Sequence, residues 1–152
     1  MNDGDSIEKE LREGRSVMVN TKGVSMRPLL WQGKTQVRIE PLKGPLKVGD
    51  MPLVRLRPGL SRLHRLIRME ENYLVTRGDN CRYAEKAALE DVLGVVTAIY
   101  RGNRQIRMDG RLYRLYVSAW QWTAPIRLPV YALRDRVRGW KHHVRSIWKK
   151  TR

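Results

Sequence analysis

Short apolar stretches separated by turn-forming residues run through the middle of the sequence, and this spacing restricts the fold more than any other feature. Gly, Pro, Asn and Asp lie between the stretches, for example in Arg57-Pro58-Gly59 and Arg77-Gly78-Asp79-Asn80. The stretches occupy residues 35–39, 51–56, 62–69, 73–76, 92–100 and 105–108. Since short strands with polar turns pair with their neighbours in the chain, the sequence predicts a mostly β fold with a coiled, barrel-like antiparallel sheet.

The N-terminal segment predicts one short helix before the strands begin. Asp5 followed by Glu8 is typical of a helix start, so we expect a helix near residues 6–13. Residues 16–20 alternate apolar and polar side chains, which predicts a first strand.

The chain changes character after Gly110, where apolar and basic residues alternate at helical spacing. Pro125 and Pro129 are expected to divide this segment into two helices. In the second helix, one apolar face is predicted to contain Val130, Leu133, Val137, Trp140, Val144 and Trp148. We therefore expect two parts, a domain over residues 1–110 and a basic helical tail over residues 111–152.

Positive charge is concentrated near the C-terminus. Residues 101–152 contain 14 of the 31 Lys and Arg residues but only 2 of the 15 acidic residues, and the net charge of the whole chain is +16. Such a concentration predicts an anionic partner, either an acidic membrane surface or nucleic acid. The tryptophans of the tail, Trp120, Trp122, Trp140 and Trp148, suit an interfacial helix or packing on the sheet.

Several classes of protein are not expected. With Cys81 as the single cysteine, an intrachain disulfide and a multi-cysteine metal cluster are excluded, and we expect neither a metal nor a cofactor. The N-terminus has acidic residues and no apolar signal region, and no apolar run approaches the ~20 residues of a membrane span. The sequence thus predicts a protein that is cytoplasmic or peripheral at a membrane surface.

Three residues could carry chemistry, although each has an ordinary structural interpretation. Ser25 lies in a tight segment just before Pro28, where serines commonly cap a helical turn. His64 lies within the predicted strand 62–69, and Asp79 lies in a turn where Asp is common. Taken singly, none of the three predicts a catalytic site.

Taken in order, the segments around these residues resemble the signal peptidase I family. They are Gly23-Val24-Ser25-Met26-Arg27-Pro28, Gly49-Asp50-Met51-Pro52-Leu53-Val54, His64-Arg65-Leu66-Ile67 and Tyr73-Leu74-Val75-Thr76-Arg77-Gly78-Asp79-Asn80. Val92-Leu93-Gly94-Val95-Val96 looks like the closing strand of that family. The resemblance covers roughly residues 16–100, and histidine at the base position matches the histidine-containing branch.

The resemblance implies a serine endopeptidase that cleaves a peptide or a preprotein. Ser25 would be the nucleophile, and its backbone N–H would donate to the oxyanion, while His64 would be the general base. Asp79 would orient the imidazole, and Glu85, six residues further on, stands where the histidine branch has a second acid. Family enzymes usually carry membrane anchors, whose place the tail over residues 111–152 could take.

Alternatives of other classes stay open. The chain could be an inactive relative that keeps the fold as a binding module. It could instead be a nucleic-acid-binding module that uses the basic tail, although no recognised binding motif supports this and nucleic acid is the less expected partner. Self-cleaving repressors of the same clan combine a helix-turn-helix with a Ser-Lys dyad, and neither is evident here.

Overall fold

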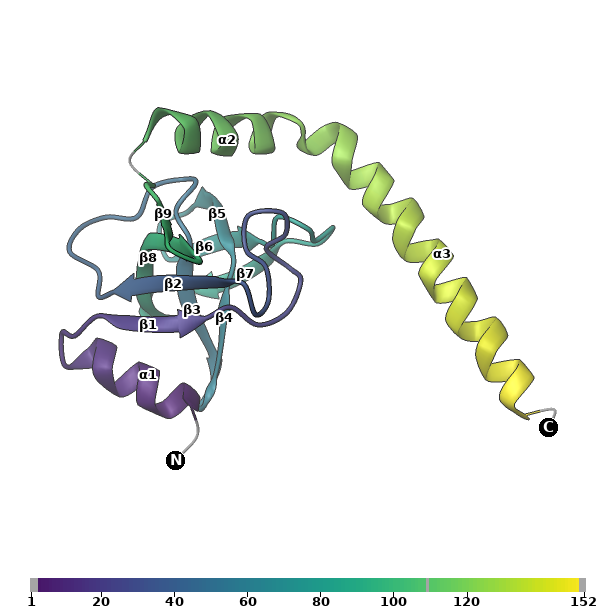
Figure 1. The fold of residues 1–152 in the computed structure, drawn as a ribbon, viewed down its shortest axis with the longest axis horizontal. Coiled ribbons are helices and arrows are strands. Elements are labelled where there is room, and N and C mark those ends of the chain that lie inside the picture. The colour runs from purple at the N-terminus through teal and green to yellow at the C-terminus, as the bar shows by residue number, and fades with distance from the viewer. Residues whose placement is uncertain (1–2, 109, 151–152) are drawn as a thin grey trace.

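The computed structural model describes residues 3–108 and 110–150, with side chains as far as residue 137. Within these residues, two antiparallel sheets form a mostly β domain, which one helix borders at the N-terminus and two helices follow (Figure 1). The helices are α1 (Asp3–Arg12), the 3₁₀ turn η1 (Leu89–Asp91), α2 (Arg111–Trp122) and α3 (Ala124–Lys150). The strands are β1 (Val17–Asn20), β2 (Thr35–Glu40), β3 (Pro52–Arg57), β4 (Leu60–Leu63), β5 (Arg65–Met69), β6 (Tyr73–Arg77), β7 (Glu85–Ala88), β8 (Val92–Arg101) and β9 (Arg104–Ile106).

The larger sheet curls into an antiparallel half-barrel, which confirms the predicted fold class. Its strands follow the order β1-β2-β8-β3-β4, and β9 pairs with β8. A smaller sheet has the order β5-β6-β7. Strands β1 and β4 are therefore the two edges of the curled sheet, and their edge backbone groups have no neighbouring strand within it.

The core lies inside the curl of the larger sheet. Along β2, buried and exposed side chains alternate, as expected for a strand with one face toward a core. Val37, Ile39, Met51 and Ile99 are almost completely buried there. Each such side chain contributes about 1.5–3 kcal/mol to folding, so the half-barrel supplies the rigid frame of the domain.

The predicted strand over residues 62–69 breaks at His64. Residues before the break belong to β4 in the larger sheet, and residues after it belong to β5 in the smaller sheet. His64 thus lies where the chain passes between the sheets, instead of inside a continuous strand.

The helices differ from the predicted ones in their boundaries. Helix α1 begins at Asp3, so Asp5 lies inside the helix instead of capping it. Pro125 lies in the first turn of α3, where its missing N–H costs no hydrogen bond. Pro129 lies one turn further in and does not divide α3, because only one hydrogen bond of a 27-residue helix is lost. The tail prediction also named Trp140, Val144 and Trp148, whose side chains lie outside the described residues.

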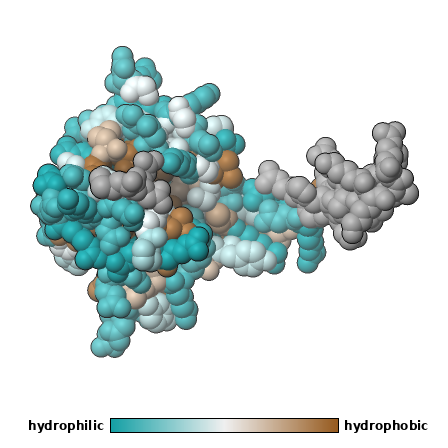
Figure 2. Space-filling view, turned by 90° about the horizontal axis from the view of Figure 1, so that it is seen from below, coloured by the Kyte–Doolittle hydropathy of each residue, from teal (hydrophilic) through white to brown (hydrophobic). Residues whose placement is uncertain are grey.

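Helix α2 crosses one end of the β domain (Figure 1). The first half of α3 contacts residues 79 and 80, and the helix then extends away from the domain (Figures 1 and 2). Tyr113 on α2 is buried and joins the core of the half-barrel. None of the described helices is long and apolar enough to cross a membrane.

Candidate active site

Ser25 lies in the loop that connects β1 to β2. Gly23 adopts a positive φ of 80°, a conformation that glycine takes easily, and residues 25–29 form successive turns. The predicted helical turn is reduced to one hydrogen bond of the α-helical type, from the Leu30 N–H to the Met26 carbonyl oxygen at 2.9 Å. Met26 and Leu30 are buried in the core, so they anchor the loop beneath Ser25.

A second loop, residues 78–81, packs against the Ser25 turn and donates hydrogen bonds to its backbone. The backbone N–H of Asn80 donates to the Ser25 carbonyl oxygen at 2.7 Å, and its side-chain amide donates to the Val24 carbonyl oxygen at 3.1 Å. Gly78 packs so closely that a Cβ there would lie 2.7 Å from the Ser25 carbonyl oxygen. The Gly-Asp-Asn segment therefore fixes the backbone of the candidate nucleophile.

His64 faces the same surface pocket as Ser25. The His64 side chain is buried, with a relative exposure of 5% for the residue, whereas Ser25 is half-buried. The pocket is also lined by Gly23, Val24, Asn80, Cys81, Arg82, Tyr83, Glu85, Arg134 and Asp135. The break between β4 and β5 thus brings His64 to the serine loop, although the two residues lie far apart in the sequence.

The carboxylate that contacts His64 belongs to Glu85, the first residue of β7. Glu85 Oε2 lies 3.4 Å from the buried Nδ1 atom of His64, at an angle that does not make a hydrogen bond. The other carboxylate oxygen pairs with Arg62 on β4. The Glu85 side chain is partly exposed, whereas the His64 side chain that it contacts is buried.

Burial lowers the pKa of His64 below its ordinary value. The negative charge of Glu85 opposes this shift, and the positive charge of Arg62 adds to it. His64 is therefore neutral at pH 7, which is the form that accepts a proton.

Asp79 has a different set of contacts from the one that the resemblance implies. Both of its carboxylate oxygens accept 2.7 Å hydrogen bonds from the Arg65 guanidinium, and the Tyr116 hydroxyl donates to it at 3.2 Å. Arg65 donates further to the Gly49 carbonyl oxygen and to the Tyr113 hydroxyl. Asp79 thus joins β5, the serine-holding loop and α2.

The Arg65–Asp79 pair is among the most buried parts of the molecule, because both side chains are only 1% exposed. Burial alone would lower the pKa of the Arg65 guanidinium, but the hydrogen bonds that it donates to Asp79 and the negative charge of Asp79 together outweigh burial and raise this pKa. Burial raises the pKa of the Tyr116 hydroxyl, and the Asp79 carboxylate raises it further. Arg65 therefore stays charged and Tyr116 stays protonated. These hydrogen bonds hold β5, the loop of residues 78–81 and α2 together.

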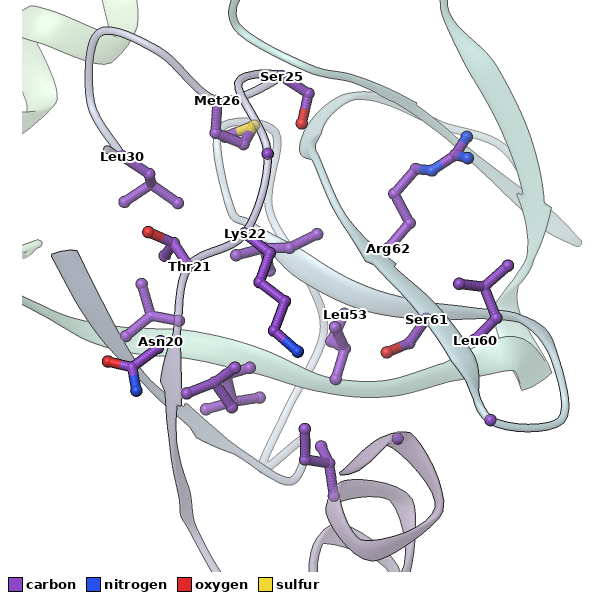
Figure 3. A pocket seen from close by; sticks show the side chains of 18 residues that line it. Asn20, Thr21, Lys22, Ser25, Met26, Leu30, Leu53, Leu60, Ser61 and Arg62 are labelled. Atoms are coloured by element: carbon purple, nitrogen blue, oxygen red, sulfur yellow. The ribbon is translucent and has the colours of Figure 1, made fainter. Parts of the chain in front are cut away.

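On its other side, Ser25 borders an apolar cleft with a volume of about 370 Å³ (Figure 3). Figure 3 shows Ser25 and Met26 at one end of the cleft, residues 20–22 along one wall, and residues 60–62 along the other. These walls belong to β1 with its following loop and to β4, the two edges of the larger sheet. Val37, Ile39 and Leu53 of the core line the cleft as well.

The backbone N–H of Ser25 fits the predicted role of oxyanion donor. In the described part of the chain, it donates to no backbone or side-chain acceptor. The turn carries no full helix, so the contribution expected from a helix dipole is small.

Three residues with clear roles around the site were not singled out from the sequence. Arg65 pairs with Asp79, Arg134 on α3 donates to the Asn80 side chain at 2.6 Å, and Arg127 donates to the Asp79 carbonyl oxygen. An arginine inside an apolar strand is a signal that could have identified Arg65, because a buried guanidinium requires a carboxylate. No comparable signal exists for the arginines of a uniformly basic helix.

No protein-family model matches this sequence, and no curated protein shows significant similarity to it. The resemblance to signal peptidases therefore stays a prediction that depends on the motifs and their order.

Proposed function

We propose that this protein is a serine endopeptidase of the signal-peptidase type, with Ser25 as nucleophile and His64 as general base. The observation that carries this proposal is the shared pocket of Ser25 and His64, beside a cleft bounded by two sheet edges. A nucleophile, a neutral base and a substrate-sized groove are the parts that acyl transfer requires.

The proposed reaction proceeds through an acyl-enzyme. His64 takes the Ser25 hydroxyl proton as Oγ attacks the carbonyl carbon of the peptide bond, and the Ser25 N–H donates to the developing oxyanion. His64 then gives this proton to the nitrogen of the leaving amine. Water, deprotonated by His64, attacks the ester and releases the acid product, and the proton returns to Ser25.

Glu85 is the acidic residue that we assign to His64 in this mechanism. Its carboxylate lies beside Nδ1, where it would stabilise the imidazolium that forms during each proton transfer. Asp79 is assigned a positioning role, because its oxygens are already occupied by Arg65 and Tyr116.

The cleft suits an extended peptide. Both β1 and β4 present edge backbone groups that could pair with a substrate strand lying between them. The apolar residues beneath, including Val37, Ile39 and Leu53, favour small or apolar substrate side chains near the scissile bond. Family enzymes favour small residues before the cleaved bond, which agrees with this cleft.

The test is peptide cleavage by the purified full-length chain, detected by mass spectrometry on a library of unstructured peptides at pH 7–8. Wild-type protein should cleave a subset, and Ser25→Ala and His64→Ala should each reduce the rate by about 10⁴-fold or more. Ser16→Ala is the control, because Ser16 is an exposed serine that lines neither pocket. Equal cleavage by wild type and Ser25→Ala, or no cleavage by either, would reject the proposal in favour of an inactive relative.

A further inference from the structure

The two C-terminal helices carry an apolar stripe that the β domain leaves exposed. We call it the outer stripe, and it consists of Leu112, Leu115, Trp122, Ile126, Val130, Leu133 and Val137. The residues recur at intervals of three, four and seven, which places them on one side of successive helical turns. Leu112 and Trp122 are 84% and 82% exposed, more than a residue in a packed face could be.

An adjacent side of the same helices is bound to the β domain. Tyr113 is buried in the core, Tyr116 donates to Asp79, and Trp120 stacks on Tyr116 with a 5.5 Å centroid separation. Further along, Arg127 and Arg134 donate to residues 79 and 80. Because these contacts fix the rotation of α2 and of the first half of α3, the outer stripe cannot turn inward to bury itself.

The surroundings of the outer stripe are strongly basic. Exposed Arg111, Arg114 and Arg136 lie on the same helices. Between residues 110 and 137, the only acidic residue is Asp135, which is paired with Arg134. A partner for this surface must therefore offer an apolar layer and negative charge together.

A second copy of the chain and a partner helix fit less well. Two copies joined through the stripe would bring together two segments with 14 basic and 2 acidic residues each, which repel one another. Pro129 is exposed and lies inside α3, where its ring leaves one backbone carbonyl oxygen without its helical hydrogen bond, and a closely packed partner helix would bury that group.

We infer that the outer stripe binds the surface of a membrane that contains anionic lipids, with α2 and α3 lying in the interface. The apolar side chains would enter the boundary between headgroups and acyl chains, and the arginines would contact lipid phosphates. This binding does not require Ser25 to be catalytic, so it stands or fails separately from the proposed peptidase activity.

The test is sedimentation of the full-length chain with vesicles of phosphatidylcholine alone, or of phosphatidylcholine mixed with phosphatidylglycerol. Binding should occur with the anionic vesicles and weaken as salt is raised from 0.1 to 0.5 M, because salt screens the arginine contacts. The stripe variant Leu115→Ser/Ile126→Ser/Leu133→Ser should bind at least about tenfold more weakly. Its circular dichroism spectrum should stay unchanged, because all three side chains are exposed.

The matched control replaces three exposed apolar residues of the β domain, Met18→Ser/Leu42→Ser/Val48→Ser, and should bind as wild type does. No binding to anionic vesicles at 0.1 M salt would overturn the inference, as would equal binding by the stripe variant and the control. A dimer that forms without lipid and is lost in the stripe variant would assign the stripe to a second copy. Tighter binding to a single-stranded oligonucleotide than to the vesicles would assign the charge to nucleic acid.

Discussion

Asn80 donates a 2.7 Å backbone hydrogen bond to the carbonyl oxygen of Ser25, and thereby ties the candidate nucleophile to the Gly-Asp-Asn loop. The same residue accepts a 2.6 Å hydrogen bond from Arg134, a residue of α3. The position of the serine turn thus depends on a helix that follows the β domain in the sequence.

Replacing Asn80 by Ala should lower activity more than stability. The variant loses the amide donor to the Val24 carbonyl and the acceptor of Arg134, while its backbone bond to Ser25 remains. We expect kcat to fall about tenfold with little change in KM, because a displaced nucleophile affects the reaction more than substrate binding. The free energy of unfolding should fall by only about 1 kcal/mol. Asn72→Ala, in an exposed turn, is the control, and an unchanged kcat would contradict a positioning role for Asn80.

Gly78→Ala tests the close approach of the two loops. The new Cβ would lie 2.7 Å from the Ser25 carbonyl oxygen and 2.8 Å from Cys81 Sγ, so the loops must separate. We expect a loss of peptide cleavage of at least about tenfold, measured at saturating substrate. Gly44→Ala is the matched control, since nothing lies within 4 Å of the Cβ position there. Equal activity of the two variants would show that the contact at Gly78 does not hold Ser25.

Much of the β domain could be predicted from the sequence because most of its strands are short apolar stretches between clear turns. Strand β7 was not predicted, since Glu85-Lys86-Ala87-Ala88 is not such a stretch and forms a strand through its pairing with β6. The break at His64 was missed for a similar reason. Residues 62–69 look continuous in sequence, and only the pairing of the two halves with different strands separates them.

The residues of the candidate site could be predicted from the sequence, but the contacts between their side chains could not. Ser25 and His64 were named from motifs, and the structure brings them to one pocket. Asp79 and Glu85 are both acidic and close in sequence, so the motif alone could not distinguish their roles. Their partners distinguish them, because Arg65 binds Asp79 whereas β7 carries Glu85 to His64.

Arg65→Met should unfold far more readily than wild type, because it leaves the Asp79 carboxylate buried without its countercharge. The expected loss in the free energy of unfolding is about 3–5 kcal/mol, measured by urea denaturation. Arg68→Met on the same strand removes an ion pair with Glu70 whose side chains are 62% and 38% exposed, and should cost less than about 1 kcal/mol. Similar losses of unfolding free energy in the two variants would show that the buried Arg65–Asp79 pair contributes little to stability.

The rate of peptide cleavage should rise with pH through a midpoint below about 6.5, the ordinary pKa of histidine, because burial lowers the pKa of His64. Glu85→Gln should move the midpoint to lower pH, since the charge that raises this pKa is removed. Arg62→Gln should move it to higher pH, since Arg62 lowers this pKa. Shifts in the reverse directions would show that these charges do not act on His64.

The lowered pKa of His64 also makes the free energy of unfolding depend on pH. The unfolded chain protonates His64 at a higher pH than the folded chain does, so the stability associated with neutral His64 is present above about pH 6.5 and is lost as the pH falls toward the folded pKa. His64→Gln should flatten the pH dependence of the unfolding free energy in this range. An unchanged slope in the variant would assign the dependence to another group.

The most direct test of the Ser25–His64 pair is covalent labelling of the full-length chain by a fluorophosphonate, with the modified residue located by peptide mass spectrometry. We predict one label per chain, on the Ser25 oxygen, at a rate that falls by about 10⁴-fold in His64→Ala. Ser25→Ala should not be labelled, whereas Ser16→Ala should be labelled as wild type is. A label distributed over several serines, or a labelling rate unaffected by His64→Ala, would contradict a Ser25–His64 catalytic pair.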